Sequence, residues 1–389
     1  MKEDQRIPEF ALFGGPLHRL GHRLGLVREG TNTFRLGLAL GLSAWTVLMI
    51  LGLLQGLADR MFSIGMIGVH VRLLVAIPLF FACETWVAPR MSEFARNLVR
   101  AELVPETELP ALGSAVRRVG RTKDSWVAEV ILLLAVFAVP MIETVAHLPG
   151  STGNWAWIVG KTGGRITWLS AWYLGFCLPL FRFMMLRWLW HLGLWWYFLW
   201  RVERLKLQLR PTHSDGVGGL GYLEVVHEHF MPLVLAISAV LSAALAEDIF
   251  SGTMALEALY RLVPTVLLGT TLLFIGPLFM FSGKLWDCRS TGWSEYMAMA
   301  SRYVNAFHRR WVQNEQASGE SQLGTSDMQS LADLTNSMNV LREMRVVPAS
   351  RRLVMELAAC VLLPLAPLLL MEYDAGQLAA RLFHMLIGQ

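Results

Sequence analysis

The chain has 389 residues, of which 54% are hydrophobic and only 16% are charged, and its mean hydropathy is positive. A soluble protein of this length rarely has such a composition, because its core buries far less apolar surface. The composition therefore excludes an ordinary soluble globular protein and predicts an integral membrane protein.

Seven apolar stretches are long enough to cross a bilayer, whose hydrocarbon core needs about 20 helical residues. Each stretch is continuous rather than alternating, which favours helices over the strands of a barrel. The sequence thus predicts an all-α fold, a polytopic transmembrane bundle with additional cytoplasmic helices. The predicted spans are Leu36–Leu57, Ile67–Ala88, Trp126–Ala146, Ile166–Leu189, Phe230–Leu245, Leu262–Ser282 and Leu353–Met371.

The distribution of lysine and arginine predicts the orientation. With the N-terminus inside, the inner segments carry 26 of these residues and the outer segments carry five, as the positive-inside rule requires. The formal charge of +4 then indicates attraction to anionic lipid rather than a nucleic-acid partner. The predicted regions are an N-terminal cytoplasmic segment (1–35), six spans (36–283) with inner loops at 89–124 and 201–229, a cytoplasmic helical region (284–352), and a last span followed by an amphipathic C-terminal helix (353–389).

The fourth apolar stretch is longer than a bilayer requires. From Ile166 to Arg201 there are 36 residues, which is roughly 54 Å of helix against a hydrocarbon thickness of about 30 Å. Either one helix kinks at Pro179 and continues into the cytoplasm, or a span is followed by a re-entrant piece. We favour the long helix.

The region 284–352 is expected to form two helices. Aromatic and basic residues occur together in Thr291–Val312, and apolar residues recur at helical spacing in Asp327–Met344. Between them, Asn314–Ser326 is rich in Gly, Ser, Gln and Glu, which is typical of a linker. The C-terminal segment Gly376–Ile387 has one apolar face, for the membrane interface or a neighbouring subunit.

Ionisable residues inside spans are costly and indicate functional sites. Glu84, Glu129 and Arg187 are expected at a similar inner depth, with Arg182 slightly deeper and Glu143 near the outer end. Carboxylate–guanidinium pairs between the second, third and fourth spans would either lock the bundle or form part of an ion or proton pathway.

The segment Pro211–Gly221 is the part of the chain that neither core packing nor membrane insertion explains. Its glycines match the dinucleotide fingerprint, but a basic helical run precedes it where that motif needs a strand. Two interpretations remain open. Free backbone N–H groups beside Arg210 and His213 would bind an anion, or the glycines form a tight turn capped by Thr212 or Asp215.

A metal site is a further alternative in the same region. His213, Asp215, Glu224 and His227 are residue types that bind a divalent metal, although their spacing matches no established zinc motif. No cofactor is predicted. The chain also lacks a Gly-x-Ser-x-Gly elbow, a His-Glu-x-x-His helix, a P-loop and a Cys-x-x-Cys pair, so we lean away from an enzyme.

The sixth span carries no charge but contains small and helix-bending residues. A pore would be lined by Thr270 and Thr271 and gated at Gly276-Pro277. The alternative is close helix packing. Small residues four apart also predict packing in the first and fifth spans, at Gly37 and Gly41 and at Ser238 and Ser242.

Two passages, Pro211–Leu223 and Val347–Leu370, resemble uncharacterised bacterial multi-spanning membrane proteins. The first has the order Pro-Thr-His-x-Asp-x-x-Gly-Gly-Leu-Gly, and a proline often stands in that group where this chain has Ser214. The resemblance implies the bacterial inner membrane and carries no known activity.

These observations lead to three hypotheses about function. The leading one is a homo-oligomeric ion channel or transport protein, with the sixth span lining the pathway and the 211–221 segment near its cytoplasmic mouth. The second is a membrane-anchored sensor or scaffold whose cytoplasmic helices recruit a partner. The third is a metal-dependent membrane enzyme.

Overall fold

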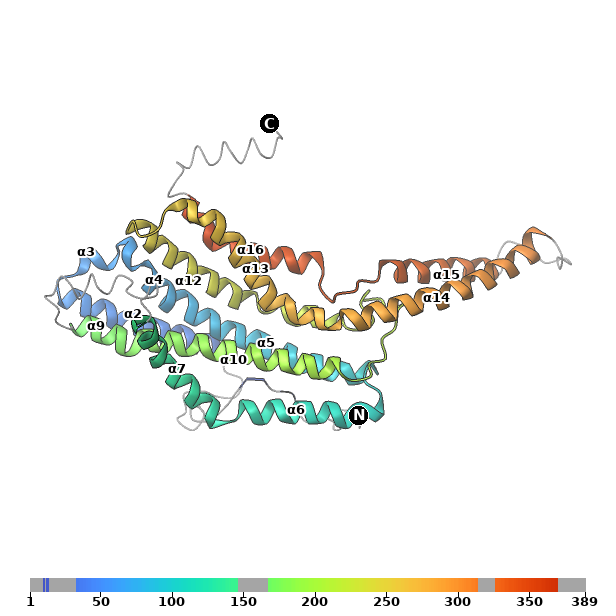
Figure 1. The fold of residues 1–389 in the computed structure, drawn as a ribbon, viewed down its shortest axis with the longest axis horizontal. Helices are drawn as coiled ribbons and strands as arrows, with labels where there is room; N and C mark the ends of the chain where they lie inside the picture. The colour runs from blue at the N-terminus through green and yellow to red at the C-terminus, as the bar shows by residue number, and fades with distance from the viewer. Residues whose placement is uncertain (1–9, 11, 14–32, 146–166, 314–325, 370–389) are drawn as a thin grey trace, which may run out of the picture.

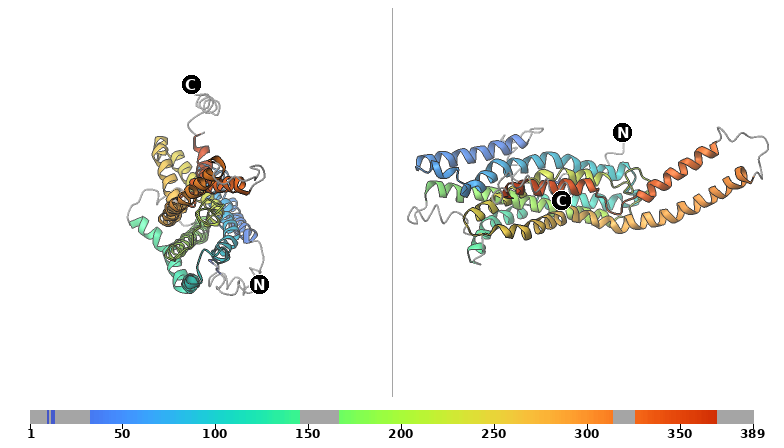
Figure 2. Two further views of the ribbon diagram at one scale, coloured as in Figure 1. Left: turned by 90° about the vertical axis from the view of Figure 1, so that its right-hand side faces the viewer. Right: turned by 90° about the horizontal axis from the view of Figure 1, so that it is seen from above.

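The computed structural model describes residues 10, 12–13, 33–145, 167–313 and 326–369. Every regular element in these ranges is a helix, which confirms the all-α prediction. Most helices run side by side along one axis, and two of them continue beyond one end of the bundle as a projecting hairpin (Figure 1, Figure 2). The predicted C-terminal helix, nearly all of the predicted linker and most of 1–35 lie outside the described residues.

The first half of the chain contains these elements: α2 (Thr33–Leu54), α3 (Ala58–Met61), η1 (Ile64–Met66), α4 (Ile67–His70), η2 (Val71–Ala76), α5 (Ile77–Arg100), η3 (Glu106–Glu108), α6 (Leu109–Lys123), α7 (Trp126–Val145), α9 (Trp168–Trp172), η4 (Tyr173–Cys177) and α10 (Leu178–Glu203). The second half contains α11 (Tyr222–Glu228), α12 (Met231–Phe250), η5 (Leu256–Ala258), α13 (Leu259–Ile275), η6 (Gly276–Phe281), α14 (Ser282–Phe307), η7 (His308–Val312), α15 (Ser326–Glu343) and α16 (Arg351–Leu369).

Five continuous helical runs are long and apolar enough to cross a membrane, and they correspond to five of the seven predicted spans. These runs are Thr33–Leu54, Ile64–Arg100, Trp168–Glu203, Tyr222–Phe250 and Leu259–Val312. The other two predicted spans form α7 and α16. In α7 the stretch Trp126–Ala138 counts as a shorter apolar helix, and α16 begins with two arginines. The count of seven spans therefore stays a prediction.

The fourth predicted span is one continuous helix of 36 residues, Trp168–Glu203. This confirms the long-helix interpretation and makes the re-entrant alternative wrong. A π-helical turn, η4, ends just before Pro179, and a second, η2, ends just before Pro78. Proline has no N–H to donate and its ring crowds the preceding turn, so the helix widens there without breaking.

Small residues bring the spans close together, as the sequence predicts. A Cβ atom on Gly41 would lie 2.2 Å from the Leu73 carbonyl oxygen, so α2 and η2 are in contact through the glycine backbone. Ser238 donates a hydrogen bond of 2.5 Å to the Val361 carbonyl, and Ser242 one of 2.5 Å to the Pro364 carbonyl. These bonds join α12 to α16, a mode of contact typical of helices in a bilayer.

The two helices predicted in 284–352 are present as α14 and α15 and form the hairpin. The first is longer than predicted, because α13, η6, α14 and η7 make one helical run of 54 residues, Leu259–Val312. Such a run is roughly 81 Å long, whereas about 30 Å crosses the hydrocarbon core. The remainder carries the hairpin away from the apolar bundle (Figure 2).

Candidate functional site at the base of the hairpin

The glycine-rich segment Pro211–Gly221, called the elbow below, is organised around Asp215. Its carboxylate accepts backbone hydrogen bonds from Val217 at 2.9 Å, Gly219 at 3.1 Å and Gly221 at 2.7 Å. The His213 Nδ1 atom lies 2.9 Å from Asp215 Oδ1. A carboxylate that accepts several backbone N–H groups is well stabilised as an anion. The three N–H groups therefore point at Asp215, and the structure has the geometry of a tight turn.

Backbone conformation explains why glycine occurs at Gly219. Its φ angle is +102°, and a Cβ atom there would lie 2.5 Å from the Leu103 Cδ2 atom. Only glycine tolerates both this conformation and this approach. The elbow is thus packed tightly against the chain that follows α5.

Arg345, which follows α15, fastens the elbow from a distant part of the chain. Its backbone N–H donates to the Gly216 carbonyl at 2.8 Å, and its Nη1 atom donates to the Glu224 carboxylate at 2.9 Å. Its Nη2 atom donates to the Asp215 carbonyl at 3.4 Å. Sequence reasoning missed Arg345, because nothing in its local pattern indicates a partner more than a hundred residues away.

Other bonds tie the base of α14 to the segment that follows α10 and to the end of α15. The Lys284 ammonium donates to the Leu205 carbonyl. The Arg289 guanidinium donates to the Arg342 carbonyl at 2.9 Å. Arg210 contributes its backbone N–H, which donates to the Gly218 carbonyl at 3.2 Å. The hairpin is therefore joined to the bundle by Lys284 on α14 and by Arg345 just after α15.

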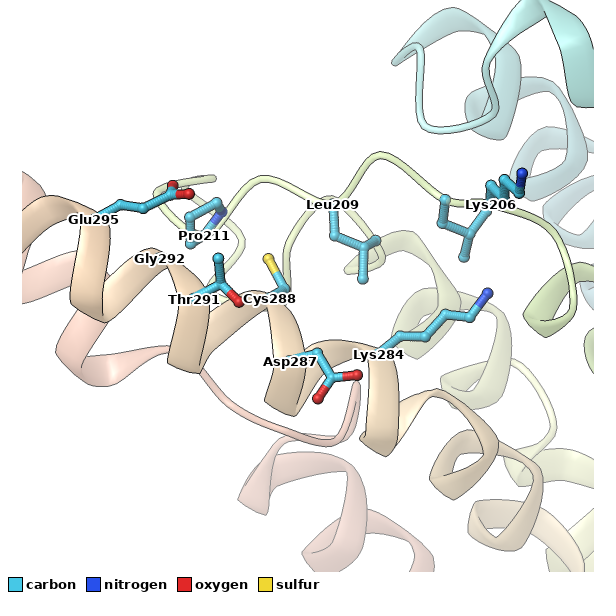
Figure 3. Close-up of a pocket in the computed structure, with 10 residues that line it drawn as sticks. Lys206, Leu209, Pro211, Lys284, Asp287, Cys288, Thr291, Gly292 and Glu295 are labelled. Carbon is cyan, nitrogen blue, oxygen red and sulfur yellow. The ribbon is translucent and has the colours of Figure 1, made fainter.

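A groove of about 450 Å³ lies between α14 and the segment 206–211 that leads into the elbow (Figure 3). Lys206 and Lys284 stand at one end of it and Glu295 stands at the other. The segment can approach α14 because a Cβ atom on Gly292 would lie only 2.7 Å from Pro211. The lining residues are Lys206, Leu207, Leu209, Pro211, Lys284, Asp287, Cys288, Thr291, Gly292 and Glu295.

The four candidate metal ligands do not converge. His213 and Asp215 are adjacent, but Glu224 pairs with Arg345. His227 is buried, with its Nδ1 atom 2.8 Å from the Leu223 carbonyl. Within the part of the chain that the structure describes, no group of three or more His, Cys, Asp or Glu residues is placed to hold a metal ion.

Two of the charges predicted inside the spans form a bidentate pair. Arg187 Nη1 lies 3.1 Å from Glu84 Oε2, and Nη2 lies 3.2 Å from Glu84 Oε1, with Glu84 only 8% exposed. This pair joins α5 to α10 as predicted. Glu129 and Arg182 also have interaction partners, and the side chain of Glu143 lies outside what is described.

A second polar layer lies nearer the other end of the same helices, and sequence reasoning found it only in part. The Arg72 guanidinium donates to the Tyr173 hydroxyl at 2.8 Å, which joins the two π-helical turns. Nearby, the Gly68 N–H donates to the Glu247 carboxylate at 2.8 Å. Arg72 is recognisable as a charge within an apolar stretch and Glu247 as a charge just beyond the end of another, but Tyr173 is not. An aromatic layer separates the two polar layers, since Phe80 and Phe181 stack with ring centroids 6.0 Å apart.

The predicted pore-lining residues lie on α13 and η6. Thr270 and Thr271 are half-buried, and the Thr271 hydroxyl donates to the Leu267 carbonyl within the helix. The helix tightens at Gly276-Pro277, where η6 begins. Pro277 cannot donate to the Leu273 carbonyl, and the Trp196 indole N–H donates to it instead at 3.2 Å. The bend is thus braced by α10.

In comparisons with known proteins, no family model, no curated protein and no solved structure matches the chain. The resemblance of Pro211–Leu223 and Val347–Leu370 to bacterial multi-spanning membrane proteins stays a prediction. The geometry of the spans and of the hairpin base is therefore the basis for the function proposed below.

Proposed function

We propose that this protein is a membrane-anchored scaffold or sensor that binds a cytosolic partner at the groove and along the α14–α15 hairpin. One observation carries the proposal: the helical run Leu259–Val312 continues from the apolar bundle into the projecting hairpin without a break. A helix of this length holds a binding surface at a set distance from the bilayer. The five apolar runs are compatible with a multi-pass membrane protein.

The bonds at the hairpin base support a mechanical role. Asp215 fixes the elbow, Arg345 ties the end of α15 to it, and Lys284 ties α14 to Leu205. Because these residues come from separate parts of the chain, a displacement of the spans is transmitted to the hairpin rather than absorbed by a loop. This rigidity suits a scaffold, and in a sensor it would couple the membrane to the partner.

The lining of the groove indicates the chemistry of the partner. Two ammonium groups stand at the bundle end and Glu295 stands at the far end, with the Asp287 carboxylate and apolar side chains such as Leu209 between them. An extended protein segment with an acidic residue at one end, and with apolar and basic residues along the rest, would be complementary to this arrangement. We therefore expect a protein partner.

Site-specific cross-linking in intact cells tests this function. A photoreactive residue at Thr291 lies in the groove, and one at the neighbouring exposed Ser290 points about 100° away around the helix. We expect a cross-link to a protein other than this chain from position 291 and not from position 290, where only a cross-link between two copies of this chain is expected. Replacing Cys288 by tryptophan should fill the groove and abolish the cross-link. Absence of any cross-link from position 291 would contradict the proposal.

The channel or transport hypothesis has a different observation in its favour, namely the two polar layers of the spans. Against it stand the stacked Phe80 and Phe181 between these layers and the Trp196 brace on the proposed gate. If the channel or transport hypothesis holds, the purified protein in liposomes should pass an ion or solute flux that changes when Thr270, Thr271 or His213 is replaced. A bilayer that remains tight to ions and solutes would exclude this hypothesis.

The cellular setting also belongs to the proposal. The excess of lysine and arginine in alternate loops supports an orientation with the N-terminus and the hairpin inside. The resemblance of Pro211–Leu223 and Val347–Leu370 supports the bacterial inner membrane. Reporter fusions at 113 and 320 should then both report the cytoplasm. A reporter active only outside at either position would overturn this orientation.

A further inference from the structure

One side of α14 carries an exposed apolar stripe, made of Trp286, Trp293, Met297 and Val304. Their exposed fractions are 61%, 41%, 43% and 48%. The intervals between them are seven, four and seven residues, which is the spacing of a seam with a 3.5-residue repeat. On a helix with 3.6 residues per turn the four side chains share one face.

The other faces of α14 already have neighbours or a different character. The groove is lined from the opposite side of the helix, by Lys284, Cys288, Thr291 and Glu295. The α15 helix packs on a third side, where the Tyr303 hydroxyl donates to the Asp327 carbonyl at 2.9 Å. The stripe is thus separate from both the groove and the hairpin contact.

Lipid does not account for most of the stripe. The predicted sixth span, Leu262–Ser282, already has the length needed to cross the hydrocarbon core. Along the continuous helix, Val304 lies roughly 33 Å beyond Ser282 at 1.5 Å per residue. Only Trp286 is near enough to the interface to contact headgroups. Trp293, Met297 and Val304 need a protein to cover them.

We propose that two copies of this chain pair through the stripe as a parallel coiled coil. A 3.5-residue repeat fits another helix that runs alongside with left-handed supercoiling. Two copies inserted with the same orientation in one bilayer are related by a two-fold axis along the membrane normal. Their α14 helices are therefore parallel, and each residue of the stripe meets its own counterpart in the other copy. Exposed serines, Ser290, Ser294 and Ser301, flank one edge of the stripe and bring no like charges together.

The size of the stripe sets the conditions under which pairing occurs. From the usual side-chain areas and the exposed fractions, the contact would bury roughly 800 Å² in total, which is below the size of a typical stable interface. Anchoring in one bilayer raises the effective concentration of the α14 helices and lowers the entropy cost of their pairing. We therefore expect the dimer in membranes and dissociation at high dilution in detergent.

Disulfide trapping tests the pairing with the full chain in liposomes. The background is Cys288→Ser, which removes the cysteine on the groove side of α14. In this background, M297C places a thiol on the stripe and A298C places one on the neighbouring exposed position, about 100° around the helix. Under mild oxidation we expect a covalent dimer from M297C and none above background from A298C. No dimer from M297C, or equal dimer from both variants, would overturn the proposal.

Two further measurements separate pairing from misfolding and from other geometries. Val304→Glu should abolish the M297C dimer, whereas Ala298→Glu should leave it unchanged. A dimer that persists in the Val304→Glu variant would contradict the stripe. Efficient trapping between W293C and V304C copies, with none between identical copies, would indicate an antiparallel pair and also refute the proposal. Because the liposomes contain no cytosolic protein, the result is independent of the proposed recruiting function.

Discussion

Replacing Asp215 by alanine would remove the acceptor of three backbone hydrogen bonds at once, from Val217, Gly219 and Gly221. A hydrogen bond to a charged group contributes about 1.5–3 kcal/mol. The Asp215 side chain is 18% exposed, so water would satisfy part of the lost bonding. We therefore expect the free energy of unfolding to fall by about 2–4 kcal/mol rather than by the full sum.

Asparagine at the same position gives a finer test. The Oδ1 atom accepts from Val217 and Gly219, and the Oδ2 atom accepts from Gly221 alone. Asp215→Asn can retain a neutral acceptor for the first two, but its amide nitrogen would then face the Gly221 N–H. Since neutral bonds are about half as strong as charge-assisted ones, the loss should be intermediate, about 1–2 kcal/mol.

Reversible unfolding in detergent, followed by circular dichroism, measures these losses. Ser214→Ala changes an exposed neighbour and serves as the control, with an expected change within about 0.5 kcal/mol. The loss in the free energy of unfolding should increase in the order Ser214→Ala, Asp215→Asn, Asp215→Ala. If Asp215→Ala is as stable as the control, or if Asn is worse than Ala, then the carboxylate does not hold the elbow as described.

Two other predictions concern the packing of the elbow and a pair of charges within the spans. Gly219→Ala should lower the free energy of unfolding by about 1–3 kcal/mol, because of its positive φ angle and its approach to Leu103. Gly216 also has a positive φ angle, but a Cβ atom there would meet no atom within 4 Å. In chemical denaturation, Gly216→Ala should therefore lower the free energy of unfolding clearly less than Gly219→Ala does. Equal losses would refute the role of the contact with Leu103. Glu84→Leu should destabilise by about 3–5 kcal/mol because it leaves the Arg187 charge buried. Adding Arg187→Leu should recover much of this loss in a double-mutant cycle, whereas simple addition of the two losses would show that the pair is uncoupled.

The long helices were predictable because membrane insertion depends on local hydropathy. The apolar length of 166–201 was enough to favour one long helix, and the structure shows that this helix continues past Pro179. The spacing of Ser238 and Ser242 likewise predicted close packing. It did not predict which helix would accept their hydrogen bonds, since the Val361 and Pro364 carbonyls are more than a hundred residues away.

The candidate site could be located but not interpreted from the sequence. Composition alone separated the elbow from the spans, and Asp215 was one of two possible caps. The direction in which its carboxylate points decides between an open anion site and a closed turn. The residues around Asp215 in the sequence do not predict that direction. His227 shows the same limit, because the type of residue fits a metal ligand whereas its burial in the core does not.

By itself, the sequence determined that this chain is helical and that its apolar stretches are long enough to cross a membrane, and it predicted two further helices beyond the sixth stretch. Only the tertiary structure decided that Arg345 closes the elbow, that Trp196 braces the Gly276-Pro277 bend, and that α14 has a groove on one side and the stripe on the other. The physical reason is the range of the interactions. Hydropathy and helix periodicity act between near neighbours in the chain, whereas hydrogen bonds and packing depend on which distant segments meet.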